Sequence, residues 1–276
     1  MRIVPAHMDL SPVAVAFTLT LLAGLATGIG SLLALLAERT NTRFLSAALG
    51  FSAGVMVYVS FVELLADARA TLAGELGARA GGWAAVVAFF GGIGLTALID
   101  RLVPAAGNPH EVHRVEEMHR LPDAHLMRMG LFSAVAIALH NFPEGIATFV
   151  TALDNPRVGS TIAAAVALHN VPEGIAVAVP VFYATGSRAR AFSWSFLSGL
   201  SEPLGALVAW YLLTRVFGGT GHALSGVLLA AVAGVMVFIS FDELLPTARE
   251  YGEHHLAVYG LTAGMAVMAA SLVLLQ

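Results

Sequence analysis

The sequence predicts an all-α integral membrane protein with eight transmembrane helices and inverted repeats. Three observations carry this prediction. Of 276 residues, 58% are hydrophobic and only 12% are charged, whereas an ordinary soluble domain has about 25% charged residues. Apolar runs of about 20 residues, the length that crosses a bilayer as a helix, recur along the whole chain. Two pairs of internal segments are also closely similar to each other.

Eight apolar runs account for the predicted spans, and together they form one transmembrane domain over residues 1–276. We expect the spans at residues 13–36, 45–65, 82–100, 129–152, 158–182, 190–213, 222–245 and 256–275. The first run is too long for the apolar region of a signal peptide. Most linkers are short, but residues 103–127 form a long polar loop with four histidines: His110, His113, His119 and His125.

Arginine placement predicts the orientation of the spans. The loops after spans one, three, five and seven contain nine arginines, and the other side of the membrane contains five. Because positive loops face the cytoplasm, the His-containing loop 103–127 is expected there. Both termini are then extracytoplasmic.

Composition excludes several classes of function. Cysteine is absent, which rules out disulfides and thiolate metal sites. Lysine is absent too, so a phosphate-binding loop that ends in Lys-Ser or Lys-Thr is impossible, and we expect no nucleotide partner. The net charge is −4 and no basic block occurs, so we expect no nucleic acid.

Inverted repeats are visible in the sequence. Residues 140–147 (HNFPEGIA) match residues 169–176 (HNVPEGIA), in neighbouring spans that run in opposite directions. Residues 53–69 match residues 233–249 at 12 of 17 positions, in spans two and seven, which are antiparallel as well. Secondary transporters are often built this way, with the substrate site at the repeat interface near the bilayer midplane.

Ionisable residues fall at the predicted midplane. His140, His169 and Glu202 are each the twelfth or thirteenth residue of their spans, where an unpaired charge costs several kcal/mol. Helical spacing puts each motif's His, Asn and Glu on one face. The candidate metal ligands are therefore His140, Asn141, Glu144, His169, Asn170, Glu173 and Glu202.

Mixed imidazole and carboxylate donors suit Zn²⁺, Fe²⁺, Co²⁺ and similar ions better than Ca²⁺ or Mg²⁺. Two positions are expected, with the glutamates as bridges. One is His-rich (His140, Glu144, His169, Glu173) and one is oxygen-rich (Asn141, Glu144, Asn170, Glu173, Glu202). Pro143 and Pro172 should release the carbonyls of Leu139 and Leu168 as further oxygen donors. Crowded carboxylates should hold protons until metal displaces them, so transport should depend on pH.

Other polar residues support two interpretations each. Glu63 and Glu243 match in the repeat and lie near the ends of spans two and seven, either as carboxylates that attract cations to the two mouths or as ordinary helix-end charges. The loop histidines either bind cytosolic metal or belong to a polar linker.

The paired His-Asn-x-Pro-Glu-Gly motifs and the Ser201-Glu202-Pro203-Leu204-Gly205 step resemble the ZIP (Zrt/Irt-like protein) metal transporters, and most strongly the bacterial zinc transporters of that family. The resemblance covers essentially the whole chain. It implies a 3+2+3 arrangement of eight helices in the bacterial inner membrane. It also implies uptake of Zn²⁺, and often of Fe²⁺, Mn²⁺ or Co²⁺, as transported ions and not catalytic cofactors. The family's zinc position maps onto Glu144, His169 and Glu173, with His140 in reach.

The resemblance further implies that the second position, often linked to iron, maps onto Asn141, Glu144, Asn170, Glu173 and Glu202. It implies that helices four and five, with flanking helices, move against a scaffold. A homodimer is implied as a possible assembly, and membrane lipid is the expected surroundings.

Four alternatives compete with a carrier. An intramembrane zinc protease would need His-Glu-x-x-His, which is absent. Di-iron bundles use Glu-x-x-His, whereas here His precedes Glu by four residues, so we expect no enzyme. A channel would use the same ligands as a selectivity filter, and the sequence does not separate it from a carrier. A purely structural scaffold would have no use for so many buried charges.

Overall fold

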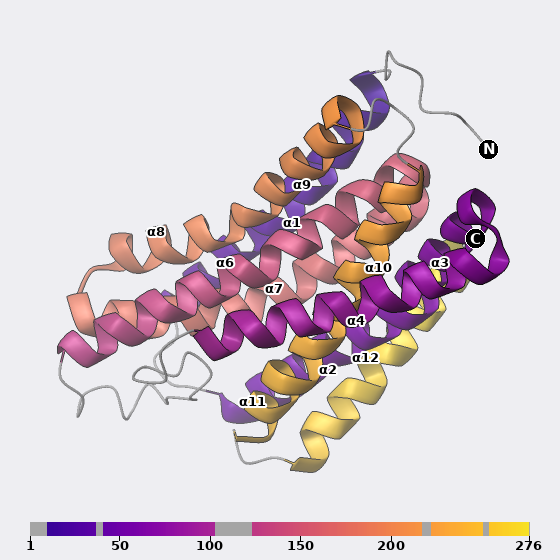
Figure 1. Cartoon of the computed structure of the whole chain (residues 1–276). Coiled ribbons are helices and arrows are strands. Elements are labelled where there is room, and N and C mark those ends of the chain that lie inside the picture. The colour runs from indigo at the N-terminus through magenta and orange to yellow at the C-terminus, as the bar shows by residue number, and fades with distance from the viewer. Residues whose placement is uncertain (1–9, 37–40, 103–122, 217–221, 251–253, 276) are drawn as a thin grey trace.

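The computed structural model describes residues 10–36, 41–102, 123–216, 222–250 and 254–275, and within these ranges the regular secondary structure is helical throughout. The elements pack side by side as one elongated bundle (Figure 1). In chain order they are α1 (Leu10–Leu36), α2 (Thr42–Val59), η1 (Ser60–Leu64), α3 (Leu65–Leu76), α4 (Ala78–Leu102), α6 (Asp123–Asp154), α7 (Pro156–Thr185), α8 (Arg188–Gly199), α9 (Ser201–Tyr211), η3 (Leu212–Val216), α10 (His222–Ile239), η4 (Ser240–Leu244), α11 (Leu245–Glu250) and α12 (His254–Leu275).

The prediction of an all-α membrane protein is confirmed. Seven helical segments of the described residues are long and apolar enough to cross a membrane: Pro12–Leu36, Thr42–Leu76, Ala78–Arg101, Pro156–Thr185, Arg188–Val216, His222–Glu250 and His255–Leu274. Each of them contains or closely matches one predicted span. The remaining predicted span, residues 129–152, lies inside helix α6 and stays a prediction as a crossing.

Several predicted boundaries were wrong. The second span was expected to end at residue 65, but the helix continues through η1 and α3 to Leu76, so Glu63 lies inside a rod and not at its end. Helix α6 begins at Asp123, so the last part of the predicted loop 103–127 is helical. The rest of that loop, residues 103–122, lies outside the described residues. The sixth span is interrupted at Leu200, because Pro203 has no N–H to bond the carbonyl of Gly199.

Polar caps set the short turns between helices. The side chain of Asn41 accepts from the backbone N–H of Phe44 at 3.0 Å, which caps the start of α2. Asn155 accepts from Arg157 at 3.1 Å, with Pro156 in the first turn of α7, where a missing N–H costs nothing. Gly186 ends α7 in the left-handed conformation, φ 61°. These caps place α6, α7 and α8 as consecutive antiparallel neighbours.

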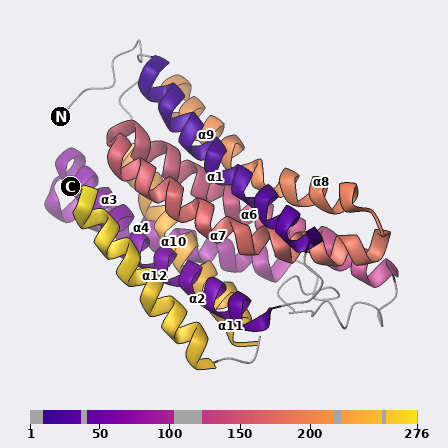
Figure 2. The same cartoon turned by 180° about the vertical axis from the view of Figure 1, so that it is seen from behind.

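Two groups of helices make up the bundle. Helices α1, α6, α7, α8 and α9 pack mainly on one another, and α2, α3, α4, α10 and α12 do the same. Helices α1, α8 and α9 lie along one edge of the molecule and α12 along the opposite edge, in both views (Figures 1 and 2). The two groups meet where α6 contacts α10 and where α7 contacts α2 and α12. The predicted site residues of α6 and α7 therefore lie on helices that face the boundary between the groups.

Close glycine contacts between helices recur in pairs. A Cβ at Gly54 of α2 would collide with the carbonyl oxygen of Leu261, and one at the repeat-equivalent Gly234 of α10 would collide with that of Phe89. Likewise Gly145 of α6 lies against the carbonyl of Glu202, and its repeat partner Gly174 of α7 lies against that of Thr27. The repetition seen in the sequence is thus present in the packing of the helices.

The repeats share an unusual backbone feature. Ser60–Leu64 and Ser240–Leu244 occupy matching positions and both form a π-helical turn. Such turns are rare and are often found at functional sites. The rods that contain them continue on both sides, so each π turn lies within a helix.

Candidate metal-ion site

The seven predicted ligands form one buried cluster. His140, Asn141 and Glu144 lie near the middle of α6, their repeat counterparts lie near the middle of α7, and Glu202 lies in the first turn of α9. None of the seven is more than 5% exposed to solvent. Pro143 and Pro172 lie within continuous helices, and each lacks the N–H that would bond the carbonyl four residues earlier.

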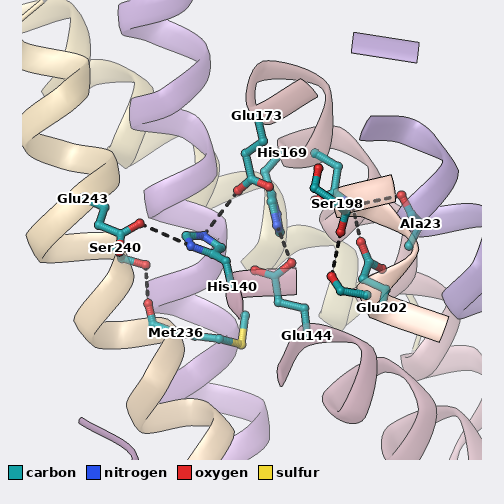
Figure 3. Close-up of polar contacts among 12 residues, drawn as sticks. Ala23, His140, Glu144, His169, Glu173, Ser198, Glu202, Met236, Ser240 and Glu243 are labelled. Carbon is teal, nitrogen blue, oxygen red and sulfur yellow. Dashed lines mark hydrogen bonds and ion pairs between the residues drawn. The ribbon is translucent and has the colours of Figure 1, made fainter. Parts of the chain in front are cut away.

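The two repeats are joined at the site by crossed contacts. The imidazole Nε2 of His169 lies 2.9 Å from Oε2 of Glu144. In the counterpart contact, Nε2 of His140 lies 3.4 Å from Oε1 of Glu173 (Figure 3). Each histidine therefore faces the glutamate of the other repeat, as the matched faces of two antiparallel helices require.

The two asparagines bind the carboxylates. The amide nitrogen of Asn170 donates to the carbonyl oxygen of Ala23 at 2.9 Å and makes a short bond to Oε1 of Glu202. With its amide nitrogen facing the acceptors, Asn141 donates to Oε2 of Glu173 at 3.0 Å and to the carbonyl of Ile137 at 3.2 Å. Glu202 is thereby tied to α7, and Glu173 to α6.

Several potential metal-binding atoms of the site make no hydrogen bond to the described residues. Within the described chain, the atoms without a hydrogen-bond partner include Oε1 of Glu144, Oε1 of Glu173, Oε2 of Glu202, Oδ1 of Asn170, Nδ1 of His169 and Nε2 of His140. A buried polar atom without a partner costs roughly 1–3 kcal/mol, so such a concentration indicates a ligand or water at this place.

The cluster is not arranged as a closed coordination sphere. In the described ranges, no three His, Asp or Glu side chains are placed so as to hold one metal ion. The reason is that the side chains are paired with one another, His169 with Glu144 and His140 with Glu173 and Glu243. A metal ion would take the place of these contacts.

Glu243 is part of the site, which the sequence reasoning did not foresee. Its Oε2 lies 3.3 Å from Nδ1 of His140, and the side chain is 15% exposed (Figure 3). It was expected near a helix end, but η4 continues into α11 as far as Glu250. The match with Glu63 in the repeat was the only signal that marked it.

The structure also contains a repeat pair that the sequence analysis missed. Residues 23–30 (AGLATGIG) of α1 match residues 198–205 (SGLSEPLG), which span the end of α8 and the start of α9. Gly30 lies against the carbonyl of Val171, as Gly205 lies against that of Phe142. Thr27 is thus the counterpart of Glu202, so the carboxylate on this pair of helices comes from one repeat only. The regular glycine spacing could have revealed the pair.

Comparison with known proteins identifies the family. A family model described as ZIP zinc transporter matches residues 102–272. The zinc transporter ZupT of Chlorobium phaeovibrioides is 60% identical over 269 residues, 97% of this chain and 99% of that protein. ZupT of Clostridium perfringens is 56% identical over 281 residues, 96% and 98% of the two chains, and ZupT of Streptococcus mutans is 56% identical over 259 residues, 94% and 97%. The chain belongs to the ZIP zinc transporter family.

Proposed function

We propose that this protein takes up Zn²⁺ into the bacterial cytoplasm as a carrier, with Fe²⁺, Mn²⁺ and Co²⁺ as further substrates. The observation that carries the proposal is the crossed pairing of His140 with Glu173 and of His169 with Glu144, buried between two helices of a membrane protein. Intramembrane ionisable residues face functional sites by default. Membership of the family and the names of its relatives support zinc as the substrate.

Two ion positions are proposed within the cluster. The first uses His140, Glu144, His169 and Glu173, and the second uses Asn141, Glu144, Asn170, Glu173 and Glu202. The carboxylate oxygens without partners, on Glu144, Glu173 and Glu202, support this, because each glutamate can bind an ion through one oxygen while the other keeps its present contact. Imidazole and carboxylate together favour Zn²⁺ over Mg²⁺.

Binding requires the present contacts to open. An arriving Zn²⁺ takes the carboxylate of Glu144 and the Nε2 lone pair of a histidine, and protons held in the crowded site leave. Release reverses these steps as protons return. The exchange of protons for metal lets one set of side chains be stable both with and without the ion.

The proposed membrane topology supports transport of the ion toward the cytoplasm. We propose that α6 also crosses the membrane, as the fourth of eight spans. From arginine placement, we further propose that both termini are extracytoplasmic and that loop 103–127 faces the cytoplasm. In this orientation Glu243 lies on the cytoplasmic side of the histidines, next to His140. Ions that leave the site inward would then pass its partly exposed carboxylate.

The division of the bundle supports a carrier rather than a channel. The group that contains α6 and α7 holds all seven ligands, and it meets the α2–α12 group over a smaller set of contacts than those within each group. We propose that the first group moves and the second serves as the scaffold. A homodimer, with lipid around it, is proposed from the family resemblance alone.

Counterflow in proteoliposomes tests the proposal. Vesicles preloaded with unlabelled Zn²⁺ should take up external ⁶⁵Zn²⁺ faster than empty vesicles, because a carrier exchanges bound ions. Uptake should saturate and should be competed by Fe²⁺, Mn²⁺ and Co²⁺ but not by Mg²⁺. A linear rate without counterflow would indicate a channel, and no Zn²⁺ movement above empty liposomes would reject the transport function.

A further inference from the structure

Glu243 fixes the orientation of one histidine of the site. Nδ1 of His140 lies 3.3 Å from Oε2 of Glu243 and its Nε2 lies 3.4 Å from Oε1 of Glu173, so the ring is held between two carboxylates. Nε2 makes no hydrogen bond within the described chain. Such carboxylate–histidine contacts commonly orient metal-binding imidazoles.

In the described part of the chain, His169 lacks a carboxylate partner at its Nδ1. Its Nδ1 is fully buried and has no partner among the described residues, while its Nε2 lies 2.9 Å from the carboxylate of Glu144. His169 is therefore held by one carboxylate, whereas His140 is held by two.

The other repeat contains a glutamate equivalent to Glu243 that is the candidate partner for His169. Glu63 in η1 is the counterpart of Glu243 in η4, and His169 is the counterpart of His140. Both glutamates lie in matching π turns on helices that pack alike, through Gly54 and Gly234. Glu63 is partly buried and lies near Asp67 of its own rod. A contact between Glu63 and His169 would be the counterpart of the contact between Glu243 and His140, but it is not formed in this structure.

We propose that Glu63 is the positioning residue for His169 in the opposite-facing state of the carrier. In that state the Glu63 carboxylate accepts the hydrogen bond of His169 Nδ1–H, and Glu243 withdraws from His140. The imidazole that is held by two carboxylates then alternates between the two repeats as the helix groups exchange positions. This inference rests on the proposed carrier function, since a protein with one conformation would have no such exchange.

Distance measurements between spin labels test the exchange. The chain has no cysteine, so Gly74→Cys on α3 and Arg157→Cys on α7 provide the only two labelling sites. Both positions are exposed, one in each helix group. Glu63→Gln should shift the ratio of the two distance populations toward the state described here, and Glu243→Gln should shift it the other way, each by about tenfold for a lost charged hydrogen bond.

The double variant and a charge control complete the test. Glu63→Gln/Glu243→Gln should return the ratio toward that of the parent, and Glu75→Gln, an exposed carboxylate on α3, should leave it unchanged. Shifts in the same direction, or identical distributions in all the proteins, would overturn the inference. Zn²⁺ uptake by the labelled parent is measured alongside. If uptake persists while the shifts fail, only this inference is rejected; if uptake is absent, the proposed function is rejected.

Discussion

His169 Nε2 lies 2.9 Å from Oε2 of Glu144, which ties the histidine of one repeat to the carboxylate of the other. The counterpart contact, between His140 and Glu173, is longer at 3.4 Å. The two halves of the site are therefore equivalent in sequence but not in geometry. Alternating-access transport needs such a difference, because two states that exchange must be distinguishable.

Removing either histidine should impair uptake. His140→Ala or His169→Ala takes away an imidazole ligand and leaves the facing carboxylate, Glu173 or Glu144, without its partner. We expect kcat/KM for Zn²⁺ to fall by at least about tenfold in each variant. Initial rates over a range of Zn²⁺ concentrations measure this. His255→Ala, at an exposed position on α12, is the control and should transport like wild type.

Glu202 should be required for the second ion but not for the first. Glu202→Gln removes the charge at α9 while its side-chain length is kept, and the His140 and His169 contacts are untouched. We expect the purified variant to bind one Zn²⁺ where wild type binds two, as counted by elemental analysis after equilibrium dialysis. Equal stoichiometry in the two proteins would remove Glu202 from the ligand set.

Acid should inhibit uptake through competition with the metal. Protons and Zn²⁺ bind the same carboxylates and imidazoles, so lowering the pH should raise KM and leave the rate at saturating Zn²⁺ nearly unchanged. Uptake with equal pH on both sides of the vesicle, at pH 5.5, 6.5 and 7.5 (about one unit apart), measures this. An increase of the rate with acid would contradict competition at the site.

Close helix packing at the site should leave no room for the methyl group that a glycine-to-alanine substitution adds. A Cβ at Gly145 would collide with the carbonyl of Glu202, and one at Gly174 with that of Thr27. Gly145→Ala or Gly174→Ala should destabilise the protein by about 1–3 kcal/mol. Gly94→Ala, where no atom lies within 4 Å of the added Cβ, is the matched control. Thermal unfolding in detergent should separate the first two variants from the third.

Much of this architecture was predictable because its signals are local. Apolar runs and the paired motifs identified the helices and brought His140, Asn141 and Glu144 together with their counterparts on α7. The family followed from the same motifs. The boundaries were less predictable, because Asp67 and Arg69 end the apolar run after Glu63, whereas packing of Ala68 and Leu72 in the core extends the rod to Leu76.

Contacts between distant helices could not be predicted from local pattern. The repeat match of Glu243 with Glu63 says nothing about which of the two meets a histidine, and only the packing of α10 against α6 puts Glu243 beside His140. The equivalence of Thr27 and Glu202 in the repeat was hard to recognise, because one side chain carries a hydroxyl and the other a carboxylate. The matched glycines, Gly24 with Gly199 and Gly30 with Gly205, were the sequence signal for that pair, and their backbone contacts identify it.

The most direct test of the central claim is the initial rate of Zn²⁺ uptake by Glu173→Gln in proteoliposomes, compared with Glu75→Gln. Glu173 faces His140, is bound by Asn141 and is proposed to bridge both ions, whereas Glu75 is an exposed carboxylate on α3. The account predicts that Glu173→Gln loses saturable uptake while Glu75→Gln keeps the wild-type rate. Wild-type uptake by Glu173→Gln, in protein folded as judged by its unfolding temperature, would contradict the assignment of the ion site.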